Sequence, residues 1–594
     1  GSPEQASLQH PTLSGLLWPI RKWPRLTAAL ASAGFLWLCY FPMAWGWLGW
    51  VALVPWLSLV RAPGSARRIY GSAWVCGLVF FLAILQWMRV ADPRMYATWV
   101  GLALCCSLFL PVGLFLIRQL DRHTPLPLVV TVPVVWTALE FLRAHIGTGF
   151  PWYFLGHTQH AFLPIIQVSD LGGAYTVSFL VAAVNALFVE WLFGQRGWRA
   201  LLSLPDEVGR TGRGNLTLHA AGVFLLVAAA LGYGFWRLGQ TDFAPGPRVT
   251  LIQGNLDQRL RNDALDSDDE KAQASMAEHY LQLTYQAVKQ QPRPDLIVWP
   301  ETSHPAGWRE LSPHLVLLAA LSAAPPAPFP GNLPWMAGAL ANRPLWLRFL
   351  NYEVIHTAER CRTPVLFGVN AYTWEPDRVS NYNAAILVEG DGRVVGRYDK
   401  IHRVPFGEYV PFKDWLPLMN KLAPYDFDYS IRPGERLTRF PLGPYHFGMV
   451  ICYEDTVPTL ARQYVGPAPG EPPIDFLLNI SNDGWFDGTS EHEEHLAISR
   501  FRAVECRRAV GRAVNMGISA LIDGNGRVIA LPAATWSASK KIPGVVSAVV
   551  PLDRRPSLYA RWGDWLPWSC WIGILLGFLV AAVPGVGQVA NLSN

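Results

Sequence analysis

Eight long apolar segments constrain the fold of this chain more than any other feature of its sequence. They lie near residues 26–41, 45–60, 69–89, 97–117, 125–142, 172–193, 218–236 and 565–583. A helix needs roughly 20 apolar residues to cross the hydrocarbon core of a bilayer. Only 16% of the 594 residues are charged, against about 25% in soluble domains. We therefore predict eight transmembrane helices, seven in a membrane domain over residues 1–240 and one near the C-terminus, over 563–586.

The first two apolar segments leave an alternative open. They are short and share the connecting sequence FPMAW. Two segments of this length could form a re-entrant hairpin instead of two spans, and we favour two spans.

The distribution of basic residues predicts the orientation of these spans. If the N-terminus lies inside, the inside segments carry 12 arginines and lysines and the outside loops only three. The inside set is Arg21, Lys22, Arg25, Arg61, Arg67, Arg68, Arg118, Arg122, Arg196, Arg199, Arg210 and Arg213; the outside set is Arg89, Arg94 and Arg143. Because short cytoplasmic loops are enriched in basic residues, we expect both termini in the cytoplasm and the residues after 240 on the opposite side.

Residues 245–555 differ in kind from the rest of the chain. Strand-like runs such as RVTLIQGN, TPVLFGVNAY and DFLLNISNDGW alternate with helical segments near 268–290 and 491–511. This alternation predicts a layered α/β domain. An apolar stretch over 312–350 interrupts it, and two interpretations stay open: a loop packed on the domain, or a flap that dips into the lipid headgroup layer.

Several classes of function find no support in the sequence. The net charge of +5 is small for this length, and no basic stripe or nucleic-acid motif is present, so we expect no nucleic-acid partner. The eight cysteines form no CxxC pair or zinc array. His492 and His495 in EHEEHL could bind a metal, but we expect a solvated helix face. Glu140 and Arg143, at the end of the fifth apolar segment, are explained equally well by a local pair or by snorkelling.

Three residues at the ends of strand-like segments suggest covalent catalysis. Glu301 ends DLIVWPE, Lys400 follows GRVVGRYD, and Cys452 follows FGMVI. Taken singly, they are explained by a surface acid, a solvated lysine and a buried thiol. A thiol that sits beside a base and a cation can become a nucleophile, provided that the fold brings the three together.

The order WPE, then DK, then CYED resembles the pattern of the nitrilase superfamily. The resemblance implies an α-β-β-α sandwich with Glu301 as general base, Lys400 as stabiliser of the oxyanion and Cys452 as nucleophile. It requires no cofactor and no metal.

Further motifs resemble one branch of that superfamily, the apolipoprotein N-acyltransferases. They are KIHRVPFGEYVPF, SNDGWF, RFRAVECRRAVGRAVNMGIS, IDGNGRV and, between two apolar segments, GFPWYFLGHTQ. The resemblance implies that Glu408 is a second essential acid and that Tyr453 and Glu454 support the nucleophile. Two departures are visible: the 312–350 stretch is longer than is usual for the family, and EHEEHL replaces a sequence that more often has glutamine before its histidine.

The family resemblance also implies an activity. It is acyl transfer from the sn-1 position of a phospholipid, with phosphatidylethanolamine as the expected donor, through a thioester on Cys452. The acceptor is the α-amine of the N-terminal diacylglyceryl-cysteine of apolipoproteins. The expected setting is a monomer in the bilayer of the bacterial inner membrane, with a periplasmic catalytic domain. Two alternatives stay open: a membrane-tethered nitrilase-type amidase and a non-catalytic membrane scaffold.

Overall fold

A computed structural model of the protein describes residues 24–205, 213–266, 269–312, 343–416, 419, 429–466 and 468–582. The predicted apolar flap over 312–350 falls mainly on residues outside these ranges. Its described part consists of Ser312 and helix α19 (Arg343–Leu350).

Six helices in the described part of the chain are long and apolar enough to cross a membrane. They span Ala66–Ala91, Met95–His123, Leu128–His145, Ala174–Phe193, Asn215–Gly239 and Trp565–Ala582. The first two apolar segments form shorter elements, α3 (Pro24–Cys39) and a broken helix over Gly46–Arg61. The membrane domain is therefore supported, whereas the count of eight spans stays a prediction.

Two sheets form the other half of the molecule. The first has the order β13 (Gly544–Leu552), β1 (Ala244–Gln253), β2 (Leu296–Val298), β4 (Val365–Trp374), β5 (Val379–Val388), β6 (Val394–Asp399), with β3 (Trp308–Leu311) paired to β4. The second has the order β12 (Val528–Ala530), β11 (Ala520–Ile522), β10 (Ala509–Val514), β9 (Phe476–Ser481), β8 (Tyr445–Ile451), β7 (Arg439–Leu442). Strands β1, β2 and β4 are parallel, and so are β8, β9 and β10. Parallel strands end at the same edge of their sheet, which gathers the residues that follow them.

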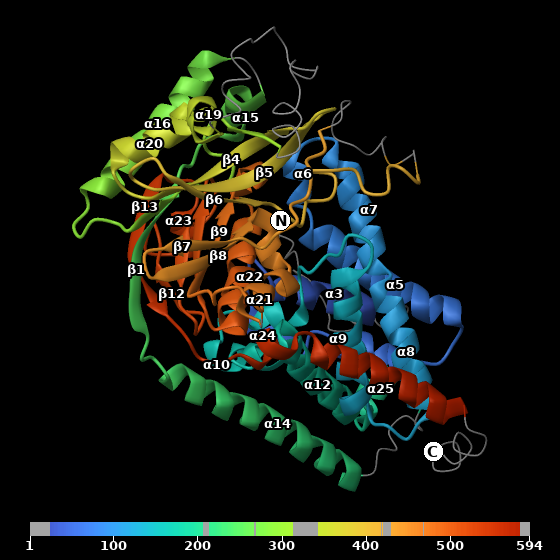
Figure 1. The fold of residues 1–594 in the computed structure, drawn as a ribbon. Coiled ribbons are helices and arrows are strands. Elements are labelled where there is room, and N and C mark those ends of the chain that lie inside the picture. Colours follow the sequence, from blue (N-terminus) through green and yellow to red (C-terminus); the bar gives the residue numbers. More distant parts are fainter. Residues whose placement is uncertain are drawn as a thin grey trace, which may run out of the picture.

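The two sheets pack face to face between layers of helices (Figure 1). Apolar side chains of both sheets, such as Leu251 and Met449, share one buried cluster. Helices α16 (Glu270–Lys289) and α20 (Tyr352–Cys361) cover the outer face of the first sheet. Helices α21 (Pro458–Val465) and α22 (Glu491–Cys506) cover the second. The layers follow the predicted order of helix, sheet, sheet and helix.

Helix α22 lies between the sandwich and the membrane helices. All 16 of its residues are buried. Ile498, Phe501 and Val504 pack in the cluster of the membrane helices, whereas Leu496 and Ala503 pack against the second sheet. The prediction that His492 and His495 occupy a solvated face is therefore wrong, because a second layer of protein covers that face.

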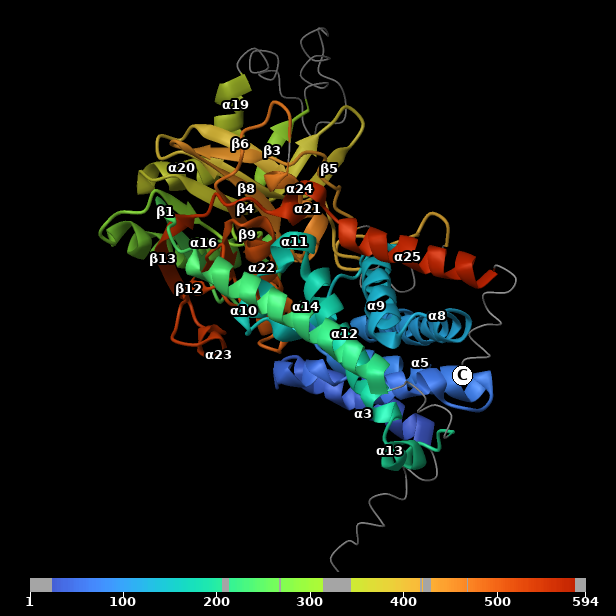
Figure 2. The same cartoon turned by 90° about the horizontal axis from the view of Figure 1, so that it is seen from below.

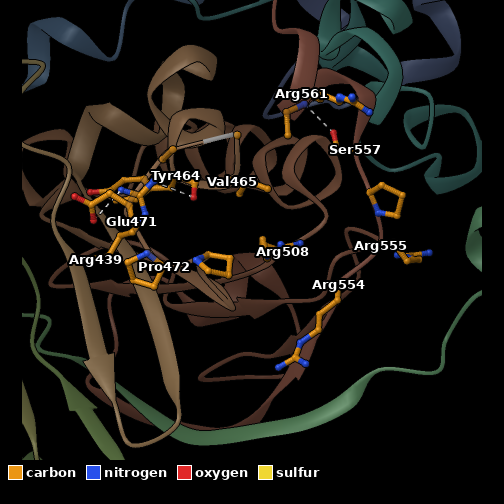
Figure 3. Close-up of a pocket in the computed structure, with 15 residues that line it drawn as sticks. Arg439, Tyr464, Val465, Glu471, Pro472, Arg508, Arg554, Arg555, Ser557 and Arg561 are labelled. Atoms are coloured by element: carbon orange, nitrogen blue, oxygen red, sulfur yellow. Dashed lines mark hydrogen bonds and ion pairs between the residues drawn. The ribbon is translucent and has the colours of Figure 1, made fainter.

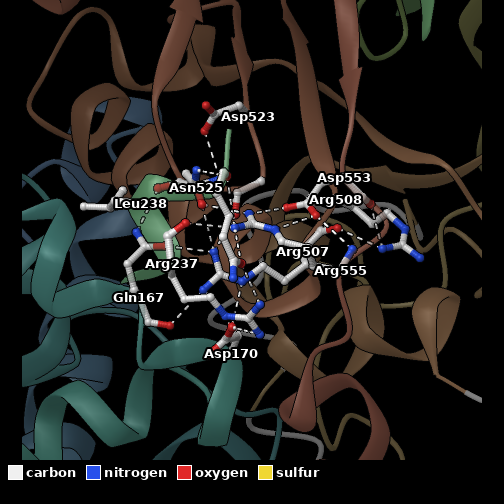
Figure 4. A network of polar contacts seen from close by, with 12 residues as sticks. Gln167, Asp170, Arg237, Leu238, Arg507, Arg508, Asp523, Asn525, Asp553 and Arg555 are labelled. Atoms are coloured by element: carbon white, nitrogen blue, oxygen red, sulfur yellow. Dashed lines mark hydrogen bonds and ion pairs between the residues drawn. The ribbon is translucent and has the colours of Figure 1, made fainter. Parts of the chain in front are cut away.

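A buried polar network also joins the two halves (Figure 4). Asp170 lies on α11 (Ser169–Gly172) and accepts hydrogen bonds from Arg507 Nε at 2.7 Å and Tyr233 OH at 2.8 Å. Its carboxylate also pairs with Arg237 at 2.9 Å. Arg237 and Tyr233 belong to α14 (Arg213–Gly239), which extends away from the sandwich as α25 (Trp565–Ala582) does (Figure 2). The carboxylate of Asp170 thus connects α11, α14 and the turn that follows α22.

We expect Asp170→Ala to lower the free energy of unfolding by about 3–5 kcal/mol, because it leaves two buried guanidinium groups without their carboxylate. Denaturant unfolding of the detergent-solubilised protein measures the change. Asp92→Ala is the control, since its ion pair with Arg94 is partly exposed and is worth at most about 1 kcal/mol. Equal effects of the two substitutions would contradict the assigned role of Asp170.

Candidate active site

Cys452 follows strand β8 and begins a short 3₁₀ helix, η6 (Cys452–Thr456). Its φ of +54° lies in the left-handed region, which non-glycine residues rarely adopt and which clusters at functional sites. Asn479 Nδ2, within β9, donates to the Cys452 carbonyl oxygen at 3.1 Å and holds this turn. The side chain is half-buried. This cysteine is therefore held at a strand end in a constrained backbone conformation.

Glu301 follows strand β2 and is 6% exposed. Its Oε1 accepts a hydrogen bond from Asn383 Nδ2 at 2.6 Å and from Lys400 Nζ at 3.4 Å. Its Oε2 accepts one from the backbone N–H of Asn482 at 2.9 Å. Donors from both sheets thus fix the carboxylate.

Lys400 follows β6 and is 1% exposed. Its Nζ donates to Glu408 Oε1 at 2.7 Å in addition to Glu301. Burial alone disfavours the charge, but the carboxylates of Glu408 and Glu301 outweigh it and raise the pKa of Lys400 well above its ordinary value. The side chain therefore stays an ammonium group.

Glu408 completes this cluster. Its Oε2 accepts from the backbone N–H of Val404 at 2.7 Å, and its Oε1 accepts from Asn383 Nδ2 at 3.2 Å as well as from Lys400. The structure thus brings Glu301, Lys400 and Glu408 together around Asn383. Asn383 was not singled out from the sequence, because a lone asparagine within a strand carries no local signal.

The charges of Glu301 and Lys400 both shift the pKa of the Cys452 thiol. Burial, with the carboxylate of Glu301 as the next cause, raises the pKa of Cys452 to about 12, while Lys400 and His495 oppose the shift. At neutral pH the sulfur is therefore a thiol in the free protein. It needs a base at the moment of attack, and Glu301 is the carboxylate that acts on it most strongly.

We expect alkylation of Cys452 by iodoacetamide to rise about tenfold per pH unit between pH 7 and 10, because the thiolate fraction grows tenfold per unit below the pKa. An ordinary thiol, with a pKa of about 8.5, levels off above pH 9. Mass spectrometry of the Cys452 peptide gives the rate. A plateau near pH 8.5 in the unsubstituted protein would contradict this.

Glu454 and Tyr453 belong to the same short helix as Cys452. Glu454 is fully buried and accepts hydrogen bonds from the backbone N–H groups of Ile401, His402 and Ile451 and from Tyr398 OH, at 2.7–2.9 Å. Burial raises the pKa of Glu454 to about 7, and the hydrogen bonds oppose this shift. The carboxylate ties the turn of Cys452 to the segment that follows Lys400.

Tyr453 contacts the membrane half of the molecule. Its hydroxyl donates to the carbonyl oxygen of Gly149 at 3.2 Å, and its ring stacks on His402 with centroids 5.7 Å apart. Gly149 belongs to the GFPWYFLGHTQ segment between two membrane helices. The residue after Cys452 thus contacts a membrane-domain loop.

Glu140 and Arg143 hold the same loop. Glu140 accepts from the backbone N–H of Leu155 at 2.6 Å, and Arg143 donates to the carbonyl oxygens of Trp152 at 2.6 Å and Tyr153 at 3.2 Å. Both side chains are buried. Backbone groups of the loop account for both side chains, and Trp136 Nε1 also donates to Glu140 Oε1 at 2.8 Å.

A buried cluster of side chains close to the turn of Cys452 has the composition of a metal site. Ligand atoms of Asp483, Glu491 and His495 lie within 4.8 Å of one another. Arg512, however, donates to Asp483 Oδ2 at 3.1 Å and to Asp455 Oδ2 at 2.7 Å, and His495 Nε2 bonds Asp455 Oδ1 at 2.7 Å. A guanidinium group already supplies the positive charge that these carboxylates need, so the cluster is suited to positioning η6 rather than to holding a cation.

Comparisons with known proteins identify the family of the chain. Residues 32–187 match the family model of the apolipoprotein N-acyltransferase N-terminal domain, and residues 248–554 match that of carbon-nitrogen hydrolase. An apolipoprotein N-acyltransferase of Geobacter metallireducens is 30% identical over 534 residues, which cover 89% of each chain. That of Rhodopirellula baltica is 28% identical over 563 residues, covering 91% of this chain and 94% of its own.

Among solved structures, Nit3 of Saccharomyces cerevisiae, a member of branch 10 of the nitrilase superfamily, is 16% identical with a TM-score of 0.33. It covers 53% of this chain and 92% of its own. The two family models and the full-length relatives decide the assignment: the chain belongs to the apolipoprotein N-acyltransferase family, acyltransferases of the carbon–nitrogen hydrolase superfamily.

Proposed function

We propose that this acyltransferase moves the sn-1 acyl chain of a phospholipid to the α-amine of the N-terminal diacylglyceryl-cysteine of apolipoproteins. The observation that carries the proposal is the cluster of Glu301 and Lys400, whose charges act on the thiol of Cys452. The hydrogen bond of Tyr453 to the Gly149 carbonyl oxygen adds support, because Gly149 belongs to a loop between two membrane helices.

In the first step, Glu301 takes the thiol proton and the sulfur of Cys452 attacks the ester carbonyl. Lys400 and the backbone N–H after Cys452 stabilise the oxyanion, and one such donor is worth about 3–4 kcal/mol. The ester C–O bond then breaks, a C–S bond forms, and Glu301 returns the proton to the departing lysophospholipid oxygen. The product is a thioester on the enzyme.

In the second step, the α-amine of the acceptor attacks the thioester carbonyl. Glu301 receives a proton from the amine, the C–N bond forms, and the C–S bond breaks. The proton passes back to the sulfur, which restores the thiol. The thioester conserves the activation of the acyl group, so neither step needs a nucleotide, a cofactor or a metal.

A membrane domain lowers the cost of bringing the two substrates together. Withdrawing a lipid chain from the bilayer costs about 0.8 kcal/mol per CH₂ group, so the reaction is easiest at headgroup depth. We assign the membrane domain to residues 1–240, the catalytic domain to 245–555 and the last helix to 563–586. The excess of basic residues in alternate loops supports cytoplasmic termini and a catalytic domain on the opposite, periplasmic side. We further propose that the protein is a monomer of the bacterial inner membrane.

Trapping of the acyl-enzyme tests the proposal. The full chain in detergent is incubated with phosphatidylethanolamine that carries acyl chains of different mass at its two positions, and the Cys452 peptide is analysed by mass spectrometry. We expect the mass of the sn-1 chain on Cys452 and its loss when a diacylglyceryl-cysteinyl peptide is added. A folded protein that acquires no acyl group but hydrolyses small amides would instead support a nitrilase-type amidase.

A further inference from the structure

A cavity of about 410 Å³ lies apart from Cys452, where the second sheet meets the segment that leads into α25 (Figure 3). Five arginines and one acid are among the residues that line it: Arg439, Arg508, Arg554, Arg555, Arg561 and Glu471. They come from β7, from the turn between α22 and β10, from the loop after α21 and from the segment 554–561. Elements distant in the sequence thus converge on one strongly basic cavity.

Carboxylates balance only part of this charge. Arg555 pairs with Asp553 at 2.6 Å and Arg554 with Asp475 at 3.2 Å. The ion pair of Arg439 with Glu471 is long, at 3.6 Å.

In the described part of the chain, the remaining two arginines, Arg508 and Arg561, have no carboxylate partner. Arg508 donates to the carbonyl oxygens of Ile474, Arg507 and Asp553. Among the described residues, no carboxylate lies within ion-pair distance of Arg508 or Arg561. The cavity therefore carries a net positive charge.

One donor in the lining is also unsatisfied. The side chain of Arg439 is 5% exposed, and its Nε has no hydrogen-bond partner in the described part of the chain. A buried donor without a partner costs free energy. Burial also lowers the pKa of Arg508. An anion in the cavity would accept a hydrogen bond from Arg439 Nε and would offset the cost of burying the Arg508 charge.

The cavity lies next to the predicted membrane surface. Arg561 is on α24 (Leu558–Trp562), only four residues before α25 begins at Trp565, so it lies at most about 14 Å from that helix. Trp562 and Trp568 are exposed on either side of this start, as expected for aromatic residues at a membrane interface. Leu575 and Leu579 farther along α25 are exposed as well, and they suit contact with acyl chains.

We propose that this cavity binds the phosphate of an anionic phospholipid, such as phosphatidylglycerol, whose acyl chains lie along α25. Guanidinium groups match phosphate oxygens in geometry and charge. The ammonium group of a zwitterionic headgroup would be repelled by the arginines that lack a carboxylate partner. This repulsion favours an anionic lipid over a zwitterionic one. The site goes beyond the proposed acyl transfer, because none of its residues belongs to the cluster at Cys452.

Binding of dihexanoyl-phosphatidylglycerol to the full chain in a non-ionic detergent tests this proposal, with native mass spectrometry as the readout. Arg554→Gln/Arg561→Gln removes the two most accessible charges. It should weaken binding about 30-fold, since each arginine near a membrane surface contributes about a fivefold factor. Arg393→Gln is the matched control, because this exposed arginine lies on the β5–β6 turn outside the cavity.

Two comparison ligands and one further variant sharpen the result. Dihexanoyl-phosphatidylcholine should bind at least about tenfold more weakly than the anionic lipid, and inorganic phosphate more weakly still. Cys452→Ala should bind the anionic lipid as the unsubstituted protein does, which separates this site from the catalytic proposal. Unchanged binding in Arg554→Gln/Arg561→Gln would overturn the proposal. So would phosphate that binds as tightly as the lipid, since the site would then be one for a free anion.

Discussion

Cys452→Ala should lower acyl transfer by at least about 10⁴-fold, because removal of a nucleophile leaves only binding and oxyanion stabilisation. No acyl group should appear on the protein. The other described cysteines of the catalytic part, Cys361 and Cys506, are buried within the packed layers and offer no substitute. Transfer to a fluorescent diacylglyceryl-cysteinyl peptide measures the loss.

Cys361→Ala is the matched control for this substitution. It removes a buried thiol from α20, on the outer face of the first sheet, and should cost only about 1 kcal/mol of stability. Its transfer rate should stay within about twofold of the unsubstituted protein. Acyl transfer by Cys452→Ala at the rate of the unsubstituted protein would show that Cys452 is not the nucleophile.

Lys400→Met should lower the rate of thioester formation by about 10²–10³-fold, because one oxyanion donor is lost. It should also lower the free energy of unfolding by about 3–5 kcal/mol, because Glu301 and Glu408 are left in a buried site without their cation. Single-turnover acylation and denaturant unfolding measure the two effects separately. Lys271→Met on the exposed face of α16 is the control.

A double variant separates catalysis from stability. Lys400→Met/Glu408→Gln removes one of the two carboxylates and should recover part of the lost stability, since the two residues are in direct contact and their effects are coupled. The rate of acylation should remain low. If activity returned together with stability, the role of Lys400 would be structural only.

The ends of the strands were the part of the site that the sequence predicted best. Glu301 and Cys452 each follow a continuous apolar run that forms a buried strand of a parallel set, β2 and β8, and Lys400 follows β6, which pairs antiparallel with β5. The asparagines that position them could not be predicted in the same way. Asn383 lies 82 residues from Glu301 and Asn482 lies 181 residues from it, so only the packing of the two sheets reveals their contacts.

The helix predicted over 491–511 is present in the structure, but its end and its surroundings differ from the prediction. The structure ends α22 at Cys506, because Arg507 adopts a left-handed backbone conformation with φ of +48°, and β10 begins at Ala509. The charged composition of α22 suggested a solvated face. Those charges instead find partners in other elements, such as the carbonyl oxygen of His160 for Arg500 at 2.6 Å, which no local pattern encodes.

The double-sided burial of α22 also bears on how inhibitors of this enzyme should be sought. A secreted fragment spanning 244–552 would uncover Ile498, Phe501 and Val504 and would separate Arg507 from Asp170. Such a fragment would aggregate, or its α22 would lose the support of the membrane helices. Compounds found against it would then bind a distorted site around Cys452. Compound libraries are therefore best tested against the whole chain in nanodiscs, where α22 keeps its packing partners on both sides.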